Sequence, residues 1–124
     1  MSLTVTADFA PVSHEIVEVM EALHARSPEI SQRFATTLYA ETAALCQRLG
    51  EGFRPLPDET ASLYFSRPIF QLLIRTSAPK RRTHQGVWRV FYELRDRDGD
   101  GSPDLVRVLT IRSAAAPPLW EELP

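Results

Sequence analysis

The hydrophobic pattern changes once along this 124-residue chain, from a helical period before Gly50 to a strand period after Gly52. Apolar residues of the first half recur every three or four positions, whereas those of the second half alternate with polar residues or form short branched runs. Helices followed by strands favour an α+β fold, in which two helices cover one face of a twisted, mostly antiparallel sheet.

The first helix is expected from about Pro11. Its apolar positions recur at spacings of four, three and four, and they are Val12, Ile16, Val19 and Leu23. Glu15, Glu18 and Glu21 occupy other positions, so we expect a solvated acidic face on this helix.

Ser27-Pro28-Glu29 predicts the start of a second helix, because it supplies an N-cap residue, a first-turn proline and a first-turn acid. Gly50 and Gly52 are expected to end this helix. Its expected core positions are Ile30, Phe34, Leu38, Leu45 and Leu49. Since only Arg26 and Ser27 separate the two helices, they should form a tight hairpin.

Four strands are expected. Residues 3–6 alternate and predict a short strand ahead of the helices, and branched apolar residues predict three more at 69–75, 87–95 and 105–113. Residues 53–60 hold two prolines and are expected to be a loop. The long connections at 77–86 and 96–104 are also expected to be loops, the first basic and the second acidic and rich in glycine.

Alternation along residues 87–95 predicts which side chains share a face of that strand. Those expected to face the helices are Trp88, Val90, Tyr92 and Leu94. Those expected to face away are Val87, Arg89, Phe91 and Glu93.

The pairing of the last two strands is predicted from these faces. If Arg95 pairs with Asp104, apolar residues meet apolar residues at three positions: Trp88 with Ile111, Val90 with Leu109, and Leu94 with Leu105. Arg89 and Arg112 then emerge together on the face away from the helices. A slip of one residue also pairs apolar groups, but it sends Arg112 to the core side.

Length and composition indicate one domain over residues 1–124, of which 113–124 form a tail. The chain has a single cysteine, Cys46, which allows no internal disulfide, so the cytoplasm is the expected compartment. Because Cys46 lies within a helical pattern, it is expected to be a small core residue. No apolar run approaches the roughly 20 residues that a membrane span needs. The first residues lack the basic and apolar regions of a secretory signal.

Positive charge is concentrated in residues 60–92, which contain no acid although the chain has a formal net charge of −2. The basic residues of this stretch are Arg67, Arg75, Lys80, Arg81, Arg82 and Arg89. Local fields decide which ligands are steered to a surface, so basic residues with interleaved aromatics indicate RNA or another polyanion. The alternative is that arginines at strand edges keep a small sheet soluble.

The order of these elements, with Trp-Arg-Val-Phe-Tyr-Glu-Leu at 88–94 and Val-Arg-Val-Leu-Thr-Ile-Arg at 106–112, resembles the RelE/ParE superfamily of type II toxins. Members of that superfamily resemble one another in a core of the form aromatic-Arg-apolar-apolar-Tyr, followed by a strand that ends in a basic or histidine-containing turn. The matching positions are 88–92, then Ile111 and Arg112. The resemblance covers about residues 3–112.

This resemblance implies a toxin that a cognate antitoxin protein neutralises by wrapping around it. RelE-like members cut mRNA on the ribosome without a metal, so the resemblance implies an mRNA endonuclease that needs no cofactor. In such a reaction the 2′-hydroxyl attacks the adjacent phosphate, and preorganised cations stabilise the negative charge that develops. Arginine suits this role because its planar fork binds two phosphate oxygens and keeps its charge.

Three arginines are candidate catalytic residues by matching to the superfamily. Arg89 matches the strand arginine, Arg112 matches the basic position that ends the last strand, and Arg75 lies on the neighbouring strand where relatives carry lysine or arginine. Lys80, Arg81 and Arg82 are candidates for RNA binding by charge alone, because the connection that holds them is longer than in relatives.

The chain departs from the superfamily after its last strand, where active nucleases tend to carry a tyrosine or histidine for proton transfer. Residues 113–122 contain neither, although Trp120 can stack on an RNA base. His84, next to the basic cluster, is a candidate general acid or base, and the alternative is a solvated loop histidine. This departure keeps open a ParE-like poison of DNA gyrase, or an inactive member that acts only by binding protein.

Residues 96–104 begin like a calcium-binding loop, with acids at positions one, three, five and nine and a glycine at position six. Position twelve is Arg107 where a bidentate glutamate is required, and the flanking segments are predicted strands, so a polar hairpin turn is expected. His14 and His24 are ten positions apart and give no metal-binding spacing, so no metal site is predicted.

Overall fold

The computed structural model describes residues 4–76 and 86–115 of the chain. Its elements in chain order are β1 (Thr6–Asp8), the short 3-10 helix η1 (Ala10–Val12), α1 (Ser13–His24), α2 (Pro28–Gly50), α3 (Glu59–Phe65), β2 (Phe70–Arg75), β3 (Val87–Arg95) and β4 (Leu105–Ser113).

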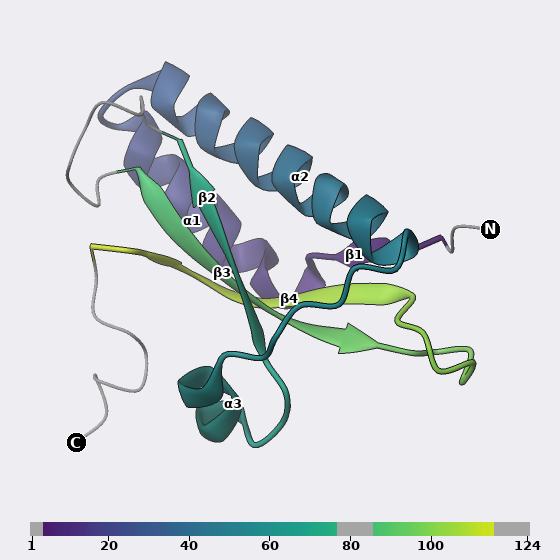
Figure 1. Cartoon of the computed structure of the whole chain (residues 1–124). Coiled ribbons are helices and arrows are strands. Elements are labelled where there is room, and N and C mark those ends of the chain that lie inside the picture. Colours follow the sequence, from purple (N-terminus) through teal and green to yellow (C-terminus); the bar gives the residue numbers. More distant parts are fainter. Residues whose placement is uncertain (1–3, 77–85, 116–124) are drawn as a thin grey trace.

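The strands form one twisted, mixed sheet in the order β1-β4-β3-β2 (Figure 1). β2, β3 and β4 are antiparallel neighbours, whereas β1 pairs with β4 in parallel. β3 and β4 are therefore interior strands, and β1 and β2 are the edges of the sheet. The predicted α+β class and the predominance of antiparallel pairing are confirmed.

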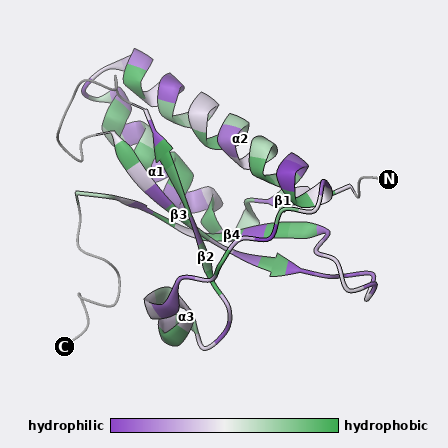
Figure 2. Cartoon of the chain, in the orientation of Figure 1, coloured by the Kyte–Doolittle hydropathy of each residue, from purple (hydrophilic) through white to green (hydrophobic). Residues whose placement is uncertain are grey.

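α1 and α2 form the predicted tight hairpin and cover one face of the sheet (Figure 1). The Ser31 hydroxyl of α2 donates a hydrogen bond of 2.9 Å to the Met20 carbonyl of α1, which fixes the two helices at their junction. Along both helices, apolar and hydrophilic residues alternate with the helical period (Figure 2). The main core lies between this hairpin and the sheet, and its largest fully buried members include Phe34, Leu38, Leu45, Leu49, Ile74, Val90, Tyr92, Val106 and Val108.

Both long strands, β3 and β4, begin and end at the predicted residues. The first strand was expected at residues 3–6 but occupies Thr6–Asp8, because its partner dictates its place. Thr6 pairs with Leu105, the first residue of β4, so earlier residues would face the hairpin loop instead of a strand. Where a short strand of a parallel pair begins and ends depends on its partner strand, and the residue pattern of the short strand alone does not show where that partner begins.

The expectation of a loop over residues 53–60 is wrong at its end, where α3 begins at Glu59. The Asp58 carboxylate caps this helix by accepting a hydrogen bond of 2.8 Å from the Ala61 backbone N–H. α3 lies on the sheet face opposite α1 and α2 (Figure 1). There it contributes to a second, smaller core, made of Ala61, Phe65, Ile69, Phe91 and Leu109.

The predicted pairing of β3 with β4 is wrong, although the predicted faces of β3 are confirmed. Arg95 pairs with Leu105, one residue later than expected, and Leu109 forms a β-bulge with no direct partner on β3. Beyond the bulge, each β3 residue pairs with a β4 residue two positions later than predicted, so that Arg89 lies directly opposite Arg112. The bulge thus returns Arg112 to the face away from the helices, where the sequence had placed it by a different pairing.

Glu15 of α1 contacts β4 at this bulge, which corrects the expectation that Glu15, Glu18 and Glu21 form one solvated face. The Glu15 carboxylate accepts hydrogen bonds from the Thr110 hydroxyl at 3.2 Å and from the Ile111 backbone N–H at 3.1 Å. A bulge leaves backbone groups without ladder partners, and a carboxylate from a packed helix satisfies one of them. Glu18 and Glu21 are exposed as expected.

We predict that Glu15→Ala lowers the free energy of unfolding by about 1–3 kcal/mol, because the Ile111 N–H at the bulge loses a charged acceptor. Urea unfolding measures the effect. Glu18→Ala is the matched control, since Glu18 is exposed and pairs with the exposed His14 side chain, and it should change stability by less than about 0.5 kcal/mol. Equal effects of the two substitutions would show that the carboxylate at the bulge contributes nothing specific.

Candidate functional site

α3 covers only part of the sheet face that lies away from α1 and α2. The part that α3 does not cover carries Leu73 and Arg75 from β2, Arg89 from β3 and Arg112 from β4, and we call these four residues the basic face. Leu73, Arg89 and Arg112 are direct cross-strand partners in one row across the sheet. Arg75 lies two residues from Leu73 on the same strand and is therefore diagonal to Arg89.

The centre of the basic face is a pair of like charges. Arg89 and Arg112 are directly opposite each other on two interior strands, a position at which Cβ atoms lie about 4.5–5.5 Å apart and like charges destabilise a sheet. Both side chains are half-buried, and Arg89 makes no ion pair with the residues at 4–76 and 86–115. A fold that only needed solubility would place such charges on its edge strands.

The structure brings together the three arginines that matching to the superfamily selected, Arg75, Arg89 and Arg112. The other predicted site residues lie outside the described part of the chain, and they are Lys80, Arg81, Arg82, His84 and Trp120. Leu73 was not selected from the sequence, although its even separation from Arg75 in a predicted strand places both on one face. Its side chain is 56% exposed beside Arg89.

A buried carboxylate, that of Glu93, lies toward the other end of β3 on this sheet face. Glu93 is only 4% exposed and contacts three guanidinium groups, from Arg67 at 2.7 Å, Arg95 at 3.0 Å and Arg107 at 3.6 Å. Arg67 follows α3, so this cluster ties α3 to the sheet. Arg107 also lies 3.4 Å from Asp8, which extends the cluster to β1, although its Nε has no hydrogen bond of good geometry.

The Glu93 cluster distinguishes structural arginines from candidate functional ones. Arg67, Arg95 and Arg107 share a buried acid, whereas the basic face lies at the other end of β3, beyond Phe91 and α3. The sequence contained one sign of this cluster, an acid among apolar residues on the strand face away from the helices. Which arginines would meet that acid depended on α3 and on the pairing of β4.

We predict that Glu93→Gln lowers the free energy of unfolding by about 1–3 kcal/mol, because a neutral amide replaces the charge that compensates three guanidinium groups. Urea unfolding at low and high salt measures the loss. Glu41→Gln on the exposed side of α2 is the matched control and should be nearly neutral. A Glu93→Gln variant as stable as the wild type would mean that the cluster does not hold α3 in place.

In the acidic hairpin loop, residues 96–104, carboxylates accept hydrogen bonds from backbone N–H groups of the loop itself. Asp96 accepts hydrogen bonds from the backbone N–H groups of Gly99, Asp100 and Gly101 at 2.9, 3.2 and 2.7 Å. Gly99 and Gly101 have φ values of 71° and 88°, which side chains with a Cβ rarely adopt. Asp104 accepts from the backbone and the side chain of Arg97. Across residues 4–76 and 86–115, no group of three or more His, Cys, Asp or Glu side chains is arranged to hold a metal ion.

Asp104 makes the stability of this hairpin depend on pH. The side-chain hydrogen bond from Arg97 is the main cause that holds the pKa of Asp104 below its usual value of 3.8. A depressed pKa stabilises the fold while the carboxylate is ionised. The contribution is therefore fully present above pH 3.8 and is lost as the pH falls through the folded-state pKa.

We predict that Asp104→Asn melts at a lower temperature than the wild type at neutral pH, and that this difference shrinks below about pH 3.8. Thermal unfolding followed by circular dichroism at several pH values measures it. Asp98→Asn is the control, because the described contacts of Asp98 in this loop come from its backbone N–H. A difference between wild type and Asp104→Asn that stays constant down to about pH 2 would contradict the role given to this carboxylate.

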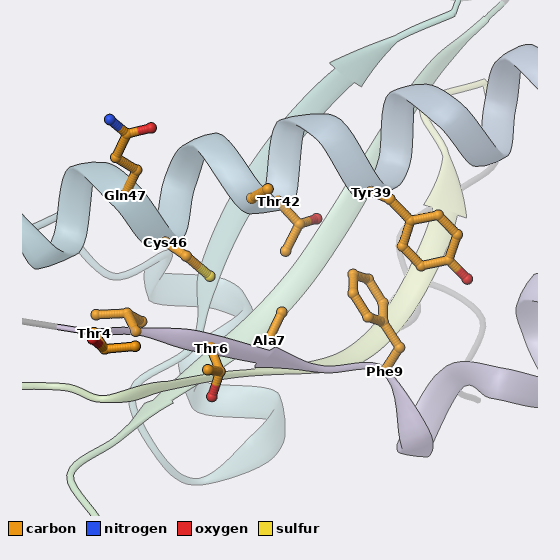
Figure 3. A pocket seen from close by; sticks show the side chains of 10 residues that line it. Thr4, Thr6, Ala7, Phe9, Tyr39, Thr42, Cys46 and Gln47 are labelled. Carbon is orange, nitrogen blue, oxygen red and sulfur yellow. The ribbon is translucent and has the colours of Figure 1, made fainter.

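A groove of about 470 Å³ lies between β1 and α2 and is a poor candidate for a polyanion site. Figure 3 shows Thr42 and Cys46 pointing from α2 toward β1, with Phe9 beside Tyr39. Of the residues that the structure describes, no lysine or arginine lines the groove. Cys46 is 7% exposed, and burial raises the pKa of its thiol, so the expected role of Cys46 as a small core residue is confirmed.

A scan against protein-family models and searches of curated proteins and of solved structures find no significant match to this chain. Among residues 4–76 and 86–115, no helix is long and apolar enough to cross a membrane. The geometry of the basic face is therefore the main observation from which a function is argued.

Proposed function

We propose that this protein is the toxin of a type II toxin–antitoxin system and acts as a metal-independent, ribosome-dependent mRNA endonuclease of the RelE type in the cytoplasm. One observation carries the proposal: Arg75, Arg89 and Arg112, selected by resemblance from separate stretches of sequence, lie together on one sheet face. The element order and the parallel pairing of β1 with β4 are compatible with the resemblance but are not specific to it.

The Arg89–Arg112 pair is suited to a phosphate group between two guanidinium forks. Each fork donates two parallel hydrogen bonds to phosphate oxygens, and a dianionic transition state relieves the repulsion between the two cations. Both arginines are on interior strands, which restricts where their backbone positions can move. An anion bound between the two guanidinium groups would reduce the repulsion between them.

The solubility alternative accounts for Arg75 but not for the pair. Arg75 is exposed on the edge strand β2, where charged residues discourage edge-to-edge pairing. Arg89 and Arg112 are half-buried on strands that have neighbours on both sides, so they protect no edge. Their arrangement is better explained by an anionic ligand.

Charge stabilisation is the main contribution that the basic face offers to the reaction. Its four residues include no histidine, tyrosine or carboxylate that transfers a proton near neutral pH. His84 remains the proposed general acid or base, and Lys80, Arg81, Arg82 and Trp120 remain proposed RNA contacts. If the protein has no group that transfers a proton, the basic face would bind a protein target instead of RNA. DNA gyrase is the target that the resemblance implies in that case.

A cognate antitoxin of acidic character is the proposed partner. The basic face supplies positive charge and includes the exposed apolar side chain of Leu73, and Leu63 on α3 is also exposed. An acidic segment with apolar residues would bury both kinds of surface when it folds on the toxin.

We predict that induction without antitoxin stops growth and creates new mRNA 5′ ends within coding regions. Arg89→Ala and Arg112→Ala should each reduce cleavage by about 10²–10³ without unfolding the protein, because each removes one transition-state contact. Arg26→Ala, an exposed arginine at the α1–α2 turn, is the matched control and should remain toxic. Mapping of transcript ends gives the cleavage readout, and chelators should not change cleavage in vitro.

Other outcomes of this induction separate the alternatives. Toxicity with intact transcripts and gyrase-linked DNA breaks would overturn the nuclease proposal in favour of a gyrase poison. Growth that continues normally with folded protein present would indicate a member without toxic activity.

A further inference from the structure

The free edge of β2 carries backbone hydrogen-bonding groups that point away from the sheet. The Thr76 N–H donates a hydrogen bond of 2.6 Å to the Gly86 carbonyl directly opposite it, so every second residue of β2, counted back from Thr76, turns its backbone groups toward β3. The backbone groups of Gln71, Leu73 and Arg75 therefore point toward the open edge. Within residues 4–76 and 86–115, no hydrogen bond occupies them there.

The same edge is closed just before β2 begins. The Asp58 N–H donates a hydrogen bond of 2.8 Å to the Ile69 carbonyl, and the Ser62 hydroxyl also bonds to the backbone of Ile69. The open part of the edge is therefore the segment from Gln71 to Arg75. Leu73 lies at its centre with 56% of its surface exposed, and a strand added at this edge would cover that apolar side chain.

We propose that two copies of the chain join through this edge, with their β2 strands antiparallel and Leu73 of one copy opposite Leu73 of the other. Gln71 of each copy is then opposite Arg75 of the other, and every such pair exchanges two backbone hydrogen bonds. The sheet continues through both copies, from β1 of one to β1 of the other. This dimer goes beyond the proposed function and does not depend on it.

The sequence of β2 favours this register over its neighbours. Pairing centred on Leu73 uses the outward backbone groups of Gln71, Leu73 and Arg75 in both copies. Pairing centred on Arg75 would set two like charges opposite each other, which destabilises a sheet. Pairing centred on Gln71 would need Ile69, whose carbonyl already accepts from Asp58. A charge on an edge strand discourages many pairings, and Arg75 thereby selects the register in which it meets a neutral glutamine.

A second copy also brings an acid to each Arg75. Glu59 is exposed and begins α3 directly after Asp58, and Asp58 is bonded to Ile69. α3 therefore begins beside the start of β2, on the side of the sheet that carries the basic face (Figure 1). In an antiparallel dimer the start of one β2 lies beside the end of the other, so Glu59 of one copy is within reach of Arg75 of the other. The two-fold symmetry forms this contact twice, which favours a second copy over an unrelated strand.

Dimerisation joins the two basic faces. Cross-strand partners lie on the same face of a sheet, so the opposed Leu73 residues place both basic faces on one side of the continuous sheet. The Arg89 residues of the two copies are then three strand spacings apart, about 14 Å. One RNA strand can contact both faces, and this consequence rests on the proposed function.

Sedimentation equilibrium of the full chain tests the dimer. The contact is small, so we expect a dissociation constant of roughly 1–100 µM. Leu73→Lys should weaken the dimer by at least about tenfold, because it sets like charges opposite each other. Val17→Lys on α1 is the matched control, since Val17 is 52% exposed, and it should dimerise as the wild type does. A wild type that stays monomeric at about 500 µM would overturn the dimer and leave the edge for a strand of another protein. A Leu73→Lys variant that dimerises as well as the wild type would overturn the choice of edge.

A disulfide tests the register. Residues of a hydrogen-bonded antiparallel pair have Cα atoms about 5.5 Å apart, a separation that a disulfide spans. Mild oxidation of Leu73→Cys should therefore link the chains into dimers, while the buried Cys46 stays unreacted. Val17→Cys has a similar exposed fraction and should link only at the rate of random collision. Equal rates of linking in the two variants would overturn the register.

A charge exchange tests the contact between Glu59 and Arg75. Glu59→Lys should weaken the dimer by at least about threefold, because each attraction becomes a repulsion. Adding Arg75→Glu to Glu59→Lys should restore the dissociation constant toward that of the wild type. Two substitutions that weaken the dimer additively, with no restoration, would overturn the placement of α3 beside the second copy.

RNA binding separates failure of the dimer from failure of the proposed function. The oxidised Leu73→Cys dimer should bind a single-stranded RNA of about twenty nucleotides with a salt dependence roughly twice as steep as that of the reduced monomer, because it contacts more phosphates. If the disulfide forms but neither state binds RNA, the dimer stands and the nuclease proposal is overturned. If the wild type binds RNA but stays monomeric and Leu73→Cys does not link, the dimer is overturned and the nuclease proposal stands.

Discussion

The β4 bulge at Leu109, beside which Glu15 accepts two hydrogen bonds, decides which side of the sheet Arg112 occupies. With the pairing that the hairpin end of β3 and β4 sets, uninterrupted alternation would place Ile111 opposite Arg89 and turn Arg112 toward the helices. Leu109 is the extra residue that reverses this, and Glu15 supplies the acceptor that the Ile111 N–H needs there. Apolar Ile111 therefore enters the main core, and two arginines meet on the other face.

The face away from the helical hairpin has two parts with different roles. Around Phe91, α3 covers the sheet with a small apolar core, and Glu93 fixes the chain after α3 through Arg67. This half uses its arginines to satisfy one buried acid. The other half has four exposed or half-buried residues, three of them cationic, and it is where the proposed anionic ligand would bind.

The sequence predicted those features that depend on local pattern. Alternation gave both ends of β3 and β4 and the faces of β3, and the Ser-Pro-Glu start gave the beginning of α2. It did not give the place of β1, which depends on a parallel partner, or the bulge at Leu109, which depends on a helix distant in sequence. The predicted pairing was wrong, yet it placed Arg89 and Arg112 on the correct face. The observed pairing begins one residue later than predicted, and the extra residue at the bulge restores the predicted face of Arg112.

A double-mutant cycle of Arg89→Gln and Arg112→Gln tests directly whether these two residues form an anion-binding pair. Unfolding free energies are measured in urea at low ionic strength, with and without inorganic phosphate. The account predicts an unfavourable coupling of about 0.2–1 kcal/mol between the two arginines without phosphate, and a coupling that becomes favourable when phosphate is added. A coupling that is zero or favourable without phosphate, and that phosphate leaves unchanged, would contradict it.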